Sequence, residues 1–222
     1  MKENILLFGT SEYSEYVYHT ILKEGTINVL GFVVNRSHYK ETEFNGLRVY
    51  VFEDLPDEFD MTDCGILITV GYTKMNSFRE KVYYECKALN YRVASFISTR
   101  CVCDSGDMGE GCIVMPTAYV PPCTKIGKCN IINMATYISH TGIIGDFNWF
   151  AATIVMGGNI KMGSNCFIGM GCTLKNGITV GSKVFLGANS YLSDNAEEGL
   201  AYIGSPAVNK RHLNSSIVID FV

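Results

Sequence analysis

The stretch Ile154–Val180, which reads IVMGGNIKMGSNCFIGMGCTLKNGITV, repeats its pattern of apolar residues and glycines every six residues. The same period extends in both directions. Counted in sixes, fifteen consecutive positions are apolar: Met108, Val114, Val120, Ile126, Ile132, Ile138, Ile144, Phe150, Met156, Met162, Ile168, Leu174, Val180, Leu186 and Leu192. A six-residue period fits neither an α-helix nor a simple hairpin. It predicts a solenoid of short parallel strands, with one strand and one turn in each hexapeptide.

The geometry of such a solenoid follows from the repeat. Three hexapeptides make one triangular coil of 18 residues, so residues 18 apart are expected to lie directly above one another. The repeated aliphatic side chains then stack into a continuous core. Glycine follows eight of the fifteen apolar positions, at Gly109, Gly127, Gly145, Gly157, Gly163, Gly169, Gly181 and Gly187. We expect these glycines to supply a positive φ angle or to relieve a crowded backbone at the corners.

The first part of the chain has a different pattern. Short apolar runs predict four buried strands, at Asn4–Phe8, Val29–Val34, Gly65–Val70 and Tyr91–Ile97. Two helical patterns lie between them, at 11–23 and 76–89, the first with Thr10 or Ser11 as its N-cap. This alternation predicts a small, parallel, Rossmann-like α/β sheet. The expected organisation is an α/β domain at 1–97, a β-helical domain at 98–211 and a C-terminal tail at 212–222.

Composition excludes several classes of protein. The 222 residues are 47% hydrophobic and 18% charged, against about 25% charged residues in average proteins. The net charge is −4, without a long run of either sign, so the basic footprint of a nucleic-acid binder is missing. No apolar run approaches the roughly 20 residues that span a bilayer, and the apolar run within Met1–Gly9 is too short for a signal peptide. We expect a soluble, cytoplasmic protein.

The nine cysteines carry little signal. Their number is odd and no C-x-x-C pair occurs, so neither a disulfide framework nor a zinc ribbon is expected. Most of them are expected to be small buried hydrophobic residues. The sequence predicts no metal site.

Several segments of the chain resemble the motifs of a known family. Ile131–Asp146 (IINMATYISHTGIIGD) resembles a stretch with an asparagine, a histidine seven residues later, and then I-G-D or I-G-E. Cys166–Gly171 (CFIGMG) and Val184–Asn189 (VFLGAN) resemble paired F-I-G-A-G coils, and Gly204–Ala207 (GSPA) resembles a closing G-x-P-A loop. With these motifs the chain resembles the left-handed β-helix acyltransferases, in particular the subgroup that acetylates nucleotide-linked or sialic-acid-type sugars for bacterial surface glycans.

The resemblance implies a catalytic role for His140. In the family this histidine is a general base, which takes a proton from the sugar amine or hydroxyl that attacks the thioester of acetyl-CoA. An imidazole suits this task because it changes protonation state near neutral pH. Thr141 stands where the family usually has an acidic residue that orients the ring, and its hydroxyl is able to accept from one ring nitrogen. Gly158, one coil beyond His140, matches a glycine whose N–H holds the thioester carbonyl.

The resemblance also implies a CoA site between the subunits of a homotrimer. It places the pantetheine arm along Met170 and Ala188. Trp149 stands where the family tends to have a second histidine that meets the acyl group or the cofactor. Pro206 belongs to the closing loop, and Lys210 follows it as a candidate contact for the CoA phosphates. Ordinary turn packing and a solvated lysine remain the alternative explanations.

The first domain is expected to bind the acceptor, a nucleotide-linked amino sugar or another sugar. Gly9, Thr10 and Ser11 stand where the family has a glycine-rich turn, and a helix N-terminus there favours a phosphate. Further candidate contacts follow the second and third strands or lie in the β-helix: Asn35, Arg36, Gly71, Tyr72 and Asn133.

The predicted function is therefore direct, acetyl-CoA-dependent transfer of an acetyl group to an amine or hydroxyl of a sugar. One alternative is a catalytically decayed trimer that binds a nucleotide or a glycan. Thr141, Trp149 and the incomplete glycine turn would mark that loss. A carbonic anhydrase built on hexapeptides is excluded, because His140 is the only histidine of the solenoid. The acceptor sugar and the length of the acyl chain stay open.

Overall fold

The computed structural model describes residues 2–59, 64–204 and 208–214, with side chains left out at 208 and 210–214. Two compact units make up the chain. The first consists of Met1–Gly71 and Lys81–Ser95, and the second of Tyr72–Glu80 and Phe96–Val222. The segment Tyr72–Glu80 thus belongs with the second unit although it lies within the first in sequence.

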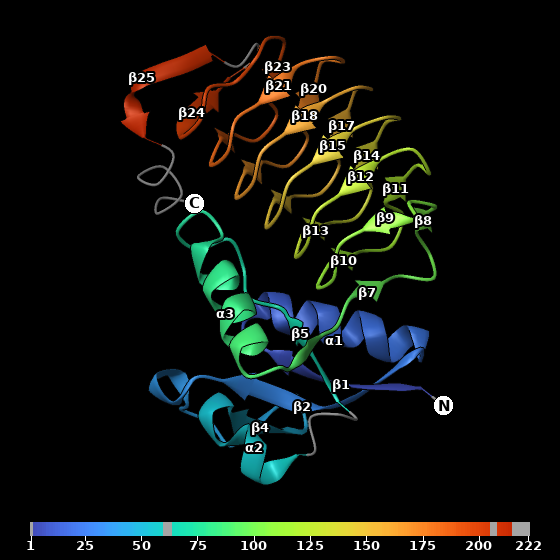
Figure 1. Cartoon of the computed structure of the whole chain (residues 1–222), viewed down its shortest axis with the longest axis vertical. Helices are drawn as coiled ribbons and strands as arrows, with labels where there is room; N and C mark the ends of the chain where they lie inside the picture. The colour runs from blue at the N-terminus through green and yellow to red at the C-terminus, as the bar shows by residue number, and fades with distance from the viewer. Residues whose placement is uncertain (1, 60–63, 205–207, 215–222) are drawn as a thin grey trace. The chain divides into compact units, whose positions relative to one another are not determined.

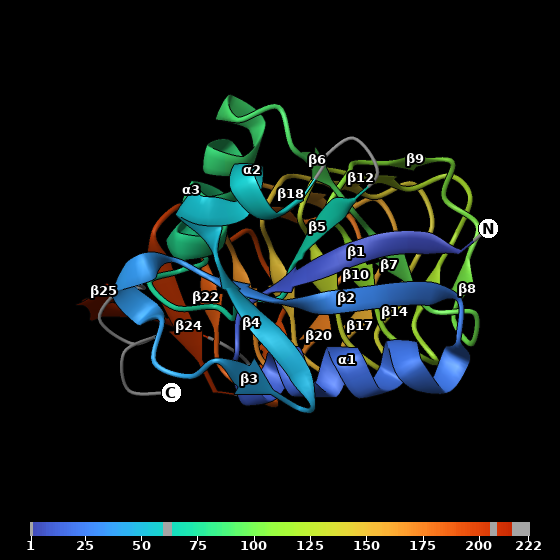
Figure 2. The same cartoon turned by 90° about the horizontal axis from the view of Figure 1, so that it is seen from below.

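The first unit is built on a six-stranded sheet (Figure 2). The strand order is β3-β4-β2-β1-β5-β6, and every pair is parallel except β3 with β4. The strands are β1 (Glu3–Phe8), β2 (Ile27–Val34), β3 (Glu43–Phe44), β4 (Leu47–Val51), β5 (Gly65–Ile68) and β6 (Arg92–Val93). The predicted α/β sheet is confirmed. The sequence pattern missed two strands, β3 and β4, and the antiparallel pairing of β3 makes the sheet mixed instead of wholly parallel.

Two helices of this part were predicted, and both are present. Helix α1 (Glu12–Glu24) begins after Ser11, whose hydroxyl accepts from the Ser14 N–H, and ends at Gly25 with φ 64°. Helix α3 spans Ser77–Ala88. Shorter elements are α2 (Leu55–Glu58), η1 (Arg36–His38) and η2 (Phe52–Asp54). The single strand expected at 91–97 is instead two, β6 and β7 (Phe96–Ile97), because the Ala94 N–H donates to Ile66 of the sheet whereas the Phe96 N–H donates to Cys112 of the solenoid.

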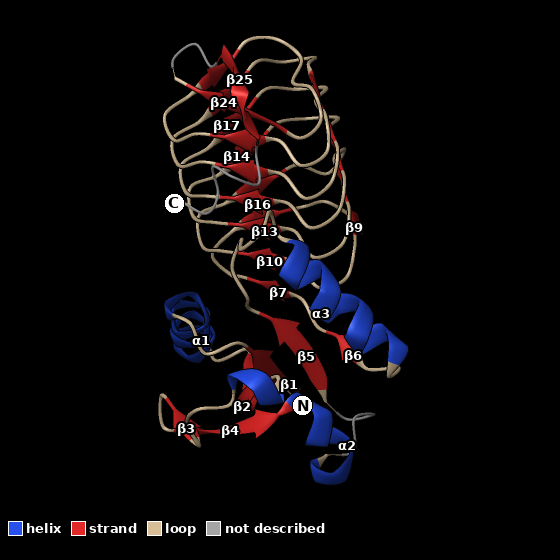
Figure 3. Ribbon diagram, turned by 90° about the vertical axis from the view of Figure 1, so that its left-hand side faces the viewer, coloured by secondary structure: helices blue, strands red, loops and turns tan. Residues whose placement is uncertain are grey.

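The second unit is the predicted solenoid, a left-handed β-helix. Its strands are stacked coil upon coil (Figures 1 and 3), and from β7 to β23 each is two residues long. After β7 they are β8 (Val102–Cys103), β9 (Asp107–Met108), β10 (Ile113–Val114), β11 (Tyr119–Val120), β12 (Lys125–Ile126), β13 (Ile131–Ile132), β14 (Tyr137–Ile138), β15 (Ile143–Ile144), β16 (Trp149–Phe150), β17 (Val155–Met156), β18 (Lys161–Met162), β19 (Phe167–Ile168), β20 (Thr173–Leu174), β21 (Thr179–Val180), β22 (Phe185–Leu186) and β23 (Tyr191–Leu192). The fifteen predicted apolar positions are the second residues of β9 to β23.

These strands form three sheets, one on each side of the triangle. The first sheet runs from β7 through β10, β13, β16, β19 and β22 to β24 (Leu200–Ile203) and β25 (Val208–Asn214). The second sheet contains β8, β11, β14, β17, β20 and β23, and the third contains β9, β12, β15, β18 and β21. All pairs are parallel except β24 with β25, which is antiparallel.

The core of the solenoid is apolar, with polar side chains only where their hydrogen bonds are satisfied. The second residue of each strand from β9 to β23 points inward, and 24 buried residues form one continuous cluster. Asn130 and Asn148 stack at one inner corner. The Asn148 amide donates to the carbonyls of Gly145 and Gly163, each at 3.1 Å, and its oxygen accepts from the Cys166 N–H at 2.8 Å. Buried amides of this kind bind successive coils to each other.

The segment Tyr72–Glu80 packs on the first sheet of the solenoid. Arg79 is fully buried, and its guanidinium donates to the carbonyls of Cys129 at 3.2 Å and Phe147 at 2.8 Å. The Asn76 amide donates to the Cys166 carbonyl at 3.0 Å, and Glu80 accepts from the Asn165 amide at 2.7 Å. The segment is therefore fastened to successive coils.

Candidate functional site

His140 lies at a corner of the solenoid, where the chain passes from the second sheet to the third. Strand β14 ends at Ile138 and β15 begins at Ile143, so His140 sits in the turn between them. The residue is exposed. Each coil makes this turn, but only this one carries a histidine. The corner therefore presents one imidazole to solvent.

Two side chains follow the imidazole in a hydrogen-bonded chain. His140 Nδ1 lies 3.0 Å from Thr141 Oγ1. Thr141 Oγ1 in turn donates to Asn159 Oδ1 at 2.6 Å. Asn159 stands one coil above Thr141, and its backbone N–H donates to the His140 carbonyl at 3.0 Å. The sequence indicated the contact of Thr141 with the ring, and it missed Asn159.

Gly158 stands directly against the imidazole, as the spacing of 18 residues predicts. A Cβ atom built on Gly158 would lie 2.6 Å from His140 Cε1 and 2.8 Å from Nε2, closer than real Cβ contacts. Glycine is therefore the residue that leaves room for this ring. Gly158 is buried, and its N–H donates to none of the described residues.

Met170 and Ala188 lie at another corner, where the chain passes from the first sheet to the second. Both are exposed, Met170 by 57% of its surface. The Asn189 N–H donates to the Met170 carbonyl at 2.8 Å, which places Met170 and Ala188 in successive coils of one column. The second sheet separates this corner from the corner of His140 and Gly158. One chain therefore does not bring the two groups together.

Trp149 and Tyr72 meet on the outside of the first sheet. Their ring centroids are 5.0 Å apart, and Tyr72 also packs edge-on against Phe167 at 4.8 Å. Trp149 is only 7% exposed. The burial of Trp149 and the ring contacts of Tyr72 favour a packing role for both, and their assignment to cofactor and acceptor binding remains a prediction. Asn133 is likewise buried, and its amide donates to the Phe150 carbonyl at 2.8 Å.

The structure does not describe the side chains of two residues that are predicted to bind CoA. Pro206 lies outside the described residues, as does most of the closing loop. Lys210 belongs to β25, of which only the backbone is described at this position.

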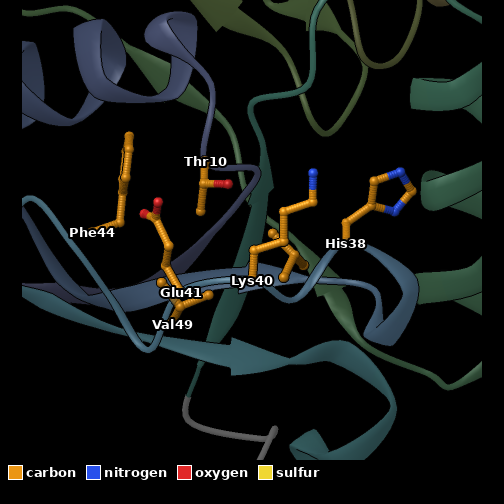
Figure 4. Close-up of a pocket in the computed structure, with 7 residues that line it drawn as sticks. Thr10, His38, Lys40, Glu41, Phe44 and Val49 are labelled. Atoms are coloured by element: carbon orange, nitrogen blue, oxygen red, sulfur yellow. The ribbon is translucent and has the colours of Figure 1, made fainter.

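The first unit contains a pocket of about 200 Å³ at the carboxyl ends of β1 and β2 (Figure 4). Of the residues predicted to bind the acceptor sugar, Thr10 is the one that lines this pocket. The other lining residues are Val34, His38, Lys40, Glu41, Phe44 and Val49. Sequence reasoning missed them because most lie between predicted elements, in a loop without periodic pattern. A lysine and a histidine within three residues of each other were the available signal.

Gly9 and Ser11 shape the turn that precedes helix α1. Gly9 has φ 128°, and a Cβ there would lie 2.7 Å from Ser14 Oγ. Ser11 and Ser14 form a capping box, in which the Ser11 Oγ accepts from the Ser14 N–H at 3.3 Å. The Ser11 hydroxyl therefore already serves the helix end.

The residues after the second and third strands that were predicted to bind the acceptor sugar do not line the pocket. Asn35 precedes η1 without a side-chain cap. Arg36 forms an ion pair with Asp54, and its N–H donates to Glu53 at 2.9 Å. Gly71 ends the first segment of its unit. The cationic group that the structure places in the pocket is Lys40 instead of Arg36.

Two negative findings apply to the described part of the chain. None of its helices is long and apolar enough to cross a membrane. No three His, Cys, Asp or Glu side chains are grouped there as a metal ion would require.

Two family models match parts of the chain. The model "Bacterial transferase hexapeptide (six repeats)" matches residues 159–194, and the model "C2185-like, N-terminal" matches residues 1–86. The first match lies wholly within the β-helix, where the six-residue period was found.

Solved structures resemble the whole chain. The acetyltransferase domain of PglB from Neisseria gonorrhoeae FA1090 is 22% identical with a TM-score of 0.82, over 94% of this chain and all of that one. WeeI from Acinetobacter baumannii AYE gives the same identity, TM-score and coverage. A histidine-to-asparagine mutant of perosamine N-acetyltransferase from Caulobacter crescentus, in complex with CoA and GDP-perosamine, is 18% identical with a TM-score of 0.83, over 93% of this chain and 96% of that one. Residues 159–194 thus match a model of bacterial transferase hexapeptide repeats, and the chain as a whole has the fold of these solved structures, an α/β unit followed by a left-handed β-helix.

Proposed function

We propose that the protein is an acetyl-CoA-dependent sugar acetyltransferase, with His140 as its general base. The observation that carries this proposal is the contact of the His140 ring with Gly158. An exposed imidazole and a free backbone N–H lie next to each other on adjacent coils. A base and an oxyanion donor in contact are what acyl transfer requires.

His140 accepts the proton of the sugar amine or hydroxyl as that group attacks the acyl carbon. Acetyl-CoA, when bound, would supply this carbon as a thioester. The Gly158 N–H donates to the acyl oxygen as negative charge develops on it. His140 then returns the proton to the leaving thiolate.

The first unit, within residues 1–97, is proposed to hold the acceptor, and residues 98–211 to transfer the acetyl group. The pocket of Figure 4 supports a nucleotide-linked sugar. Lys40 and His38 are suited to phosphate oxygens, and Thr10 lies just before the N-terminus of α1, where anions are favoured. Glu41 is suited to sugar hydroxyls. The solved PglB domain with acetyl-CoA and the perosamine enzyme with GDP-perosamine agree with this pair of substrates.

We propose that the active assembly is a homotrimer. The second sheet has an apolar outer face, formed by the first residues of its strands: Val102, Tyr119, Tyr137, Val155, Thr173 and Tyr191. Val102 is 52% and Val155 48% exposed. The His140 corner and the Met170 corner border this face on its two sides. A second copy packed here would come against both corners and would complete the site.

The proposed location is the cytoplasm. All nine cysteines are free thiols, and six of them are buried. Free thiols are typical of a reducing compartment. The pathway that the resemblance suggests is surface-glycan biosynthesis.

The test is titration with acetyl-CoA followed by an assay of CoA release with a panel of nucleotide-linked amino sugars. We expect binding in roughly the micromolar range. His140→Ala should keep this binding and lose about 10²- to 10⁴-fold in kcat. His19→Ala, which removes another exposed histidine, is the matched control. Activity that survives His140→Ala contradicts the mechanism, and failure to bind any acyl-CoA favours the decayed binding trimer.

A further inference from the structure

The hydroxyl of Thr141 has an orientation that the other corner threonines do not share. Thr117, Thr141 and Thr153 all have positive φ angles, between 58° and 64°. Thr117 and Thr153 donate to the carbonyl of the preceding residue, at 2.5 and 2.7 Å. Thr141 donates instead to Asn159 Oδ1 in the next coil. The positive φ is thus common to the corners, and the pairing with an asparagine is particular to the turn with the histidine.

The protons in this chain can be assigned one by one. Asn159 Oδ1 carries no hydrogen, so the hydrogen between it and Thr141 belongs to the hydroxyl. Because the hydroxyl has only one hydrogen, Thr141 Oγ1 is left to accept from His140 Nδ1. Nδ1 of the neutral ring then carries the proton, and Nε2 has the free lone pair.

We infer that Asn159 is a positioning residue, which acts through Thr141 to keep the proton of neutral His140 on Nδ1 and Nε2 free as the base. The role of Nε2 as base rests on the proposed function. A free neutral imidazole in water prefers its proton on Nε2, so the hydrogen-bonded chain reverses the natural preference of the side chain. Asn159 performs the task that an acidic residue beside the histidine would perform, without adding charge.

Asn159 also holds the backbone of His140. Its N–H donates to the His140 carbonyl at 3.0 Å, so a single residue fixes both the main chain and the ring of the base. Asn159 adopts φ 58°. Asparagine tolerates this left-handed conformation better than most residues. A test variant must therefore tolerate it too, and glycine does.

The tautomer is measured directly by nitrogen NMR of protein labelled with ¹⁵N-histidine, at a pH where the ring is neutral. The signals of His140 are assigned by their loss in His140→Ala. We expect the wild type to show a protonated Nδ1 and an unprotonated Nε2. In Asn159→Gly, which removes the acceptor without straining the backbone, the proton should move largely to Nε2. Lys183→Gly, at a corner residue with φ 57°, should leave the His140 signals unchanged.

Asn159→Asp is the decisive variant, because a carboxylate there is only able to accept. If the Asn159 amide accepts from Thr141, Asn159→Asp keeps the proton on Nδ1. If the amide instead donates to Thr141, the wild type has the proton on Nε2 and Asn159→Asp moves it. A proton on Nε2 in the wild type, or a change of tautomer in Asn159→Asp, would overturn the inference.

The kinetic readout separates this role from a structural one. We expect Asn159→Gly to lower kcat by about 10- to 100-fold, less than loss of the base itself, with little change in KM for acetyl-CoA. Asn159→Asp should restore most of the rate. An unchanged kcat in Asn159→Gly contradicts the inference. If the NMR signals change as expected but the wild type transfers no acyl group, the role of Asn159 in fixing the tautomer of His140 is supported and the proposed function is wrong.

Discussion

The imidazole of His140 lies against Gly158, one coil away, so close that a Cβ atom at position 158 would displace the ring. This contact links the period of the sequence to the chemistry of the corner. Because three hexapeptides close one coil, a residue 18 positions beyond the histidine must stand beside it. The fold therefore places a main-chain donor next to the base.

Gly158→Ala should reduce kcat by about 100-fold, since displacement of a catalytic group by 1 Å is enough for such a loss. The new methyl group would push the ring away from its position. Gly158 does not have a positive φ angle, so alanine adds no backbone strain, and stability should change by less than about 1 kcal/mol. Steady-state kinetics and urea unfolding measure both effects.

Gly142→Ala is the matched control in the same turn. A Cβ there meets only Thr124 Cγ2 at 3.4 Å and lies 3.7 Å or more from other atoms. We expect its kinetics to match those of the wild type. Equal losses in the two variants would show that the turn tolerates no methyl group, and the argument from the His140 contact would fail.

The positions of the solenoid strands could be predicted because the period is local. Of the two reasons expected for its glycines, a positive φ angle or a crowded backbone, the sequence could not say which applies. At Gly109 and Gly163 the φ angle is ordinary, and a Cβ would lie 2.6 Å from a backbone nitrogen of the next coil. Positive φ is adopted instead by other residues, such as Thr153 and Asn159. The sequence shows the residue types and the period of the repeat. It does not show the distance between coils, which determines where glycine is needed.

Contacts between residues that lie far apart in the sequence could not be predicted either. Arg79 binds carbonyls 50 to 69 residues further along the chain, without any periodic signal. Asn159 belongs to the site through its contacts with Thr141 and with the His140 carbonyl. His140 and Gly158 could be predicted because a motif and the 18-residue spacing both point to them. The pocket around Lys40 depends on how an irregular loop folds back over β2, which a sequence pattern does not encode.

Arg79→Met should lower the free energy of unfolding by about 3 kcal/mol, because it leaves buried carbonyl groups without their donor. The guanidinium is fully buried and donates to Cys129, Phe147 and Asn148. Urea unfolding measures the loss. Lys81→Met, on the same helix, removes only an exposed ion pair with Glu85 and should cost less than about 1 kcal/mol. A similar effect of the two variants would contradict the anchoring role of Arg79.

Val155→Lys should prevent self-association, because it places an unpaired charge in the middle of the proposed apolar interface. Val155 is 48% exposed on the second sheet. Ile143→Lys, at a 51% exposed residue on the third sheet, is the control and should keep the trimer. Light scattering after gel filtration gives the mass of each species. A trimer that persists in Val155→Lys would place the interface elsewhere, and loss of the trimer with loss of CoA release would support a site shared between copies.

Cys103 should be the thiol that reacts fastest near neutral pH. A hydrogen bond with the Cys101 side chain lowers the pKa of Cys103 from 9.0 to about 7. The thiolate, which is the nucleophile, is therefore populated above pH 7 and lost as the pH falls through that value. Burial raises the pKa of the Cys172 thiol to about 11, so Cys172 should stay unlabelled under the same conditions.

The measurement is the rate of iodoacetamide labelling at each cysteine between pH 6 and pH 9, read by mass spectrometry. Cys101→Ala removes the hydrogen-bond donor, so the midpoint of the Cys103 reaction should move upward, toward 9.0. Cys101→Ser retains a donor and should keep the midpoint near 7. A midpoint that is the same in Cys101→Ala and the wild type would mean that the thiol of Cys101 does not stabilise the Cys103 thiolate.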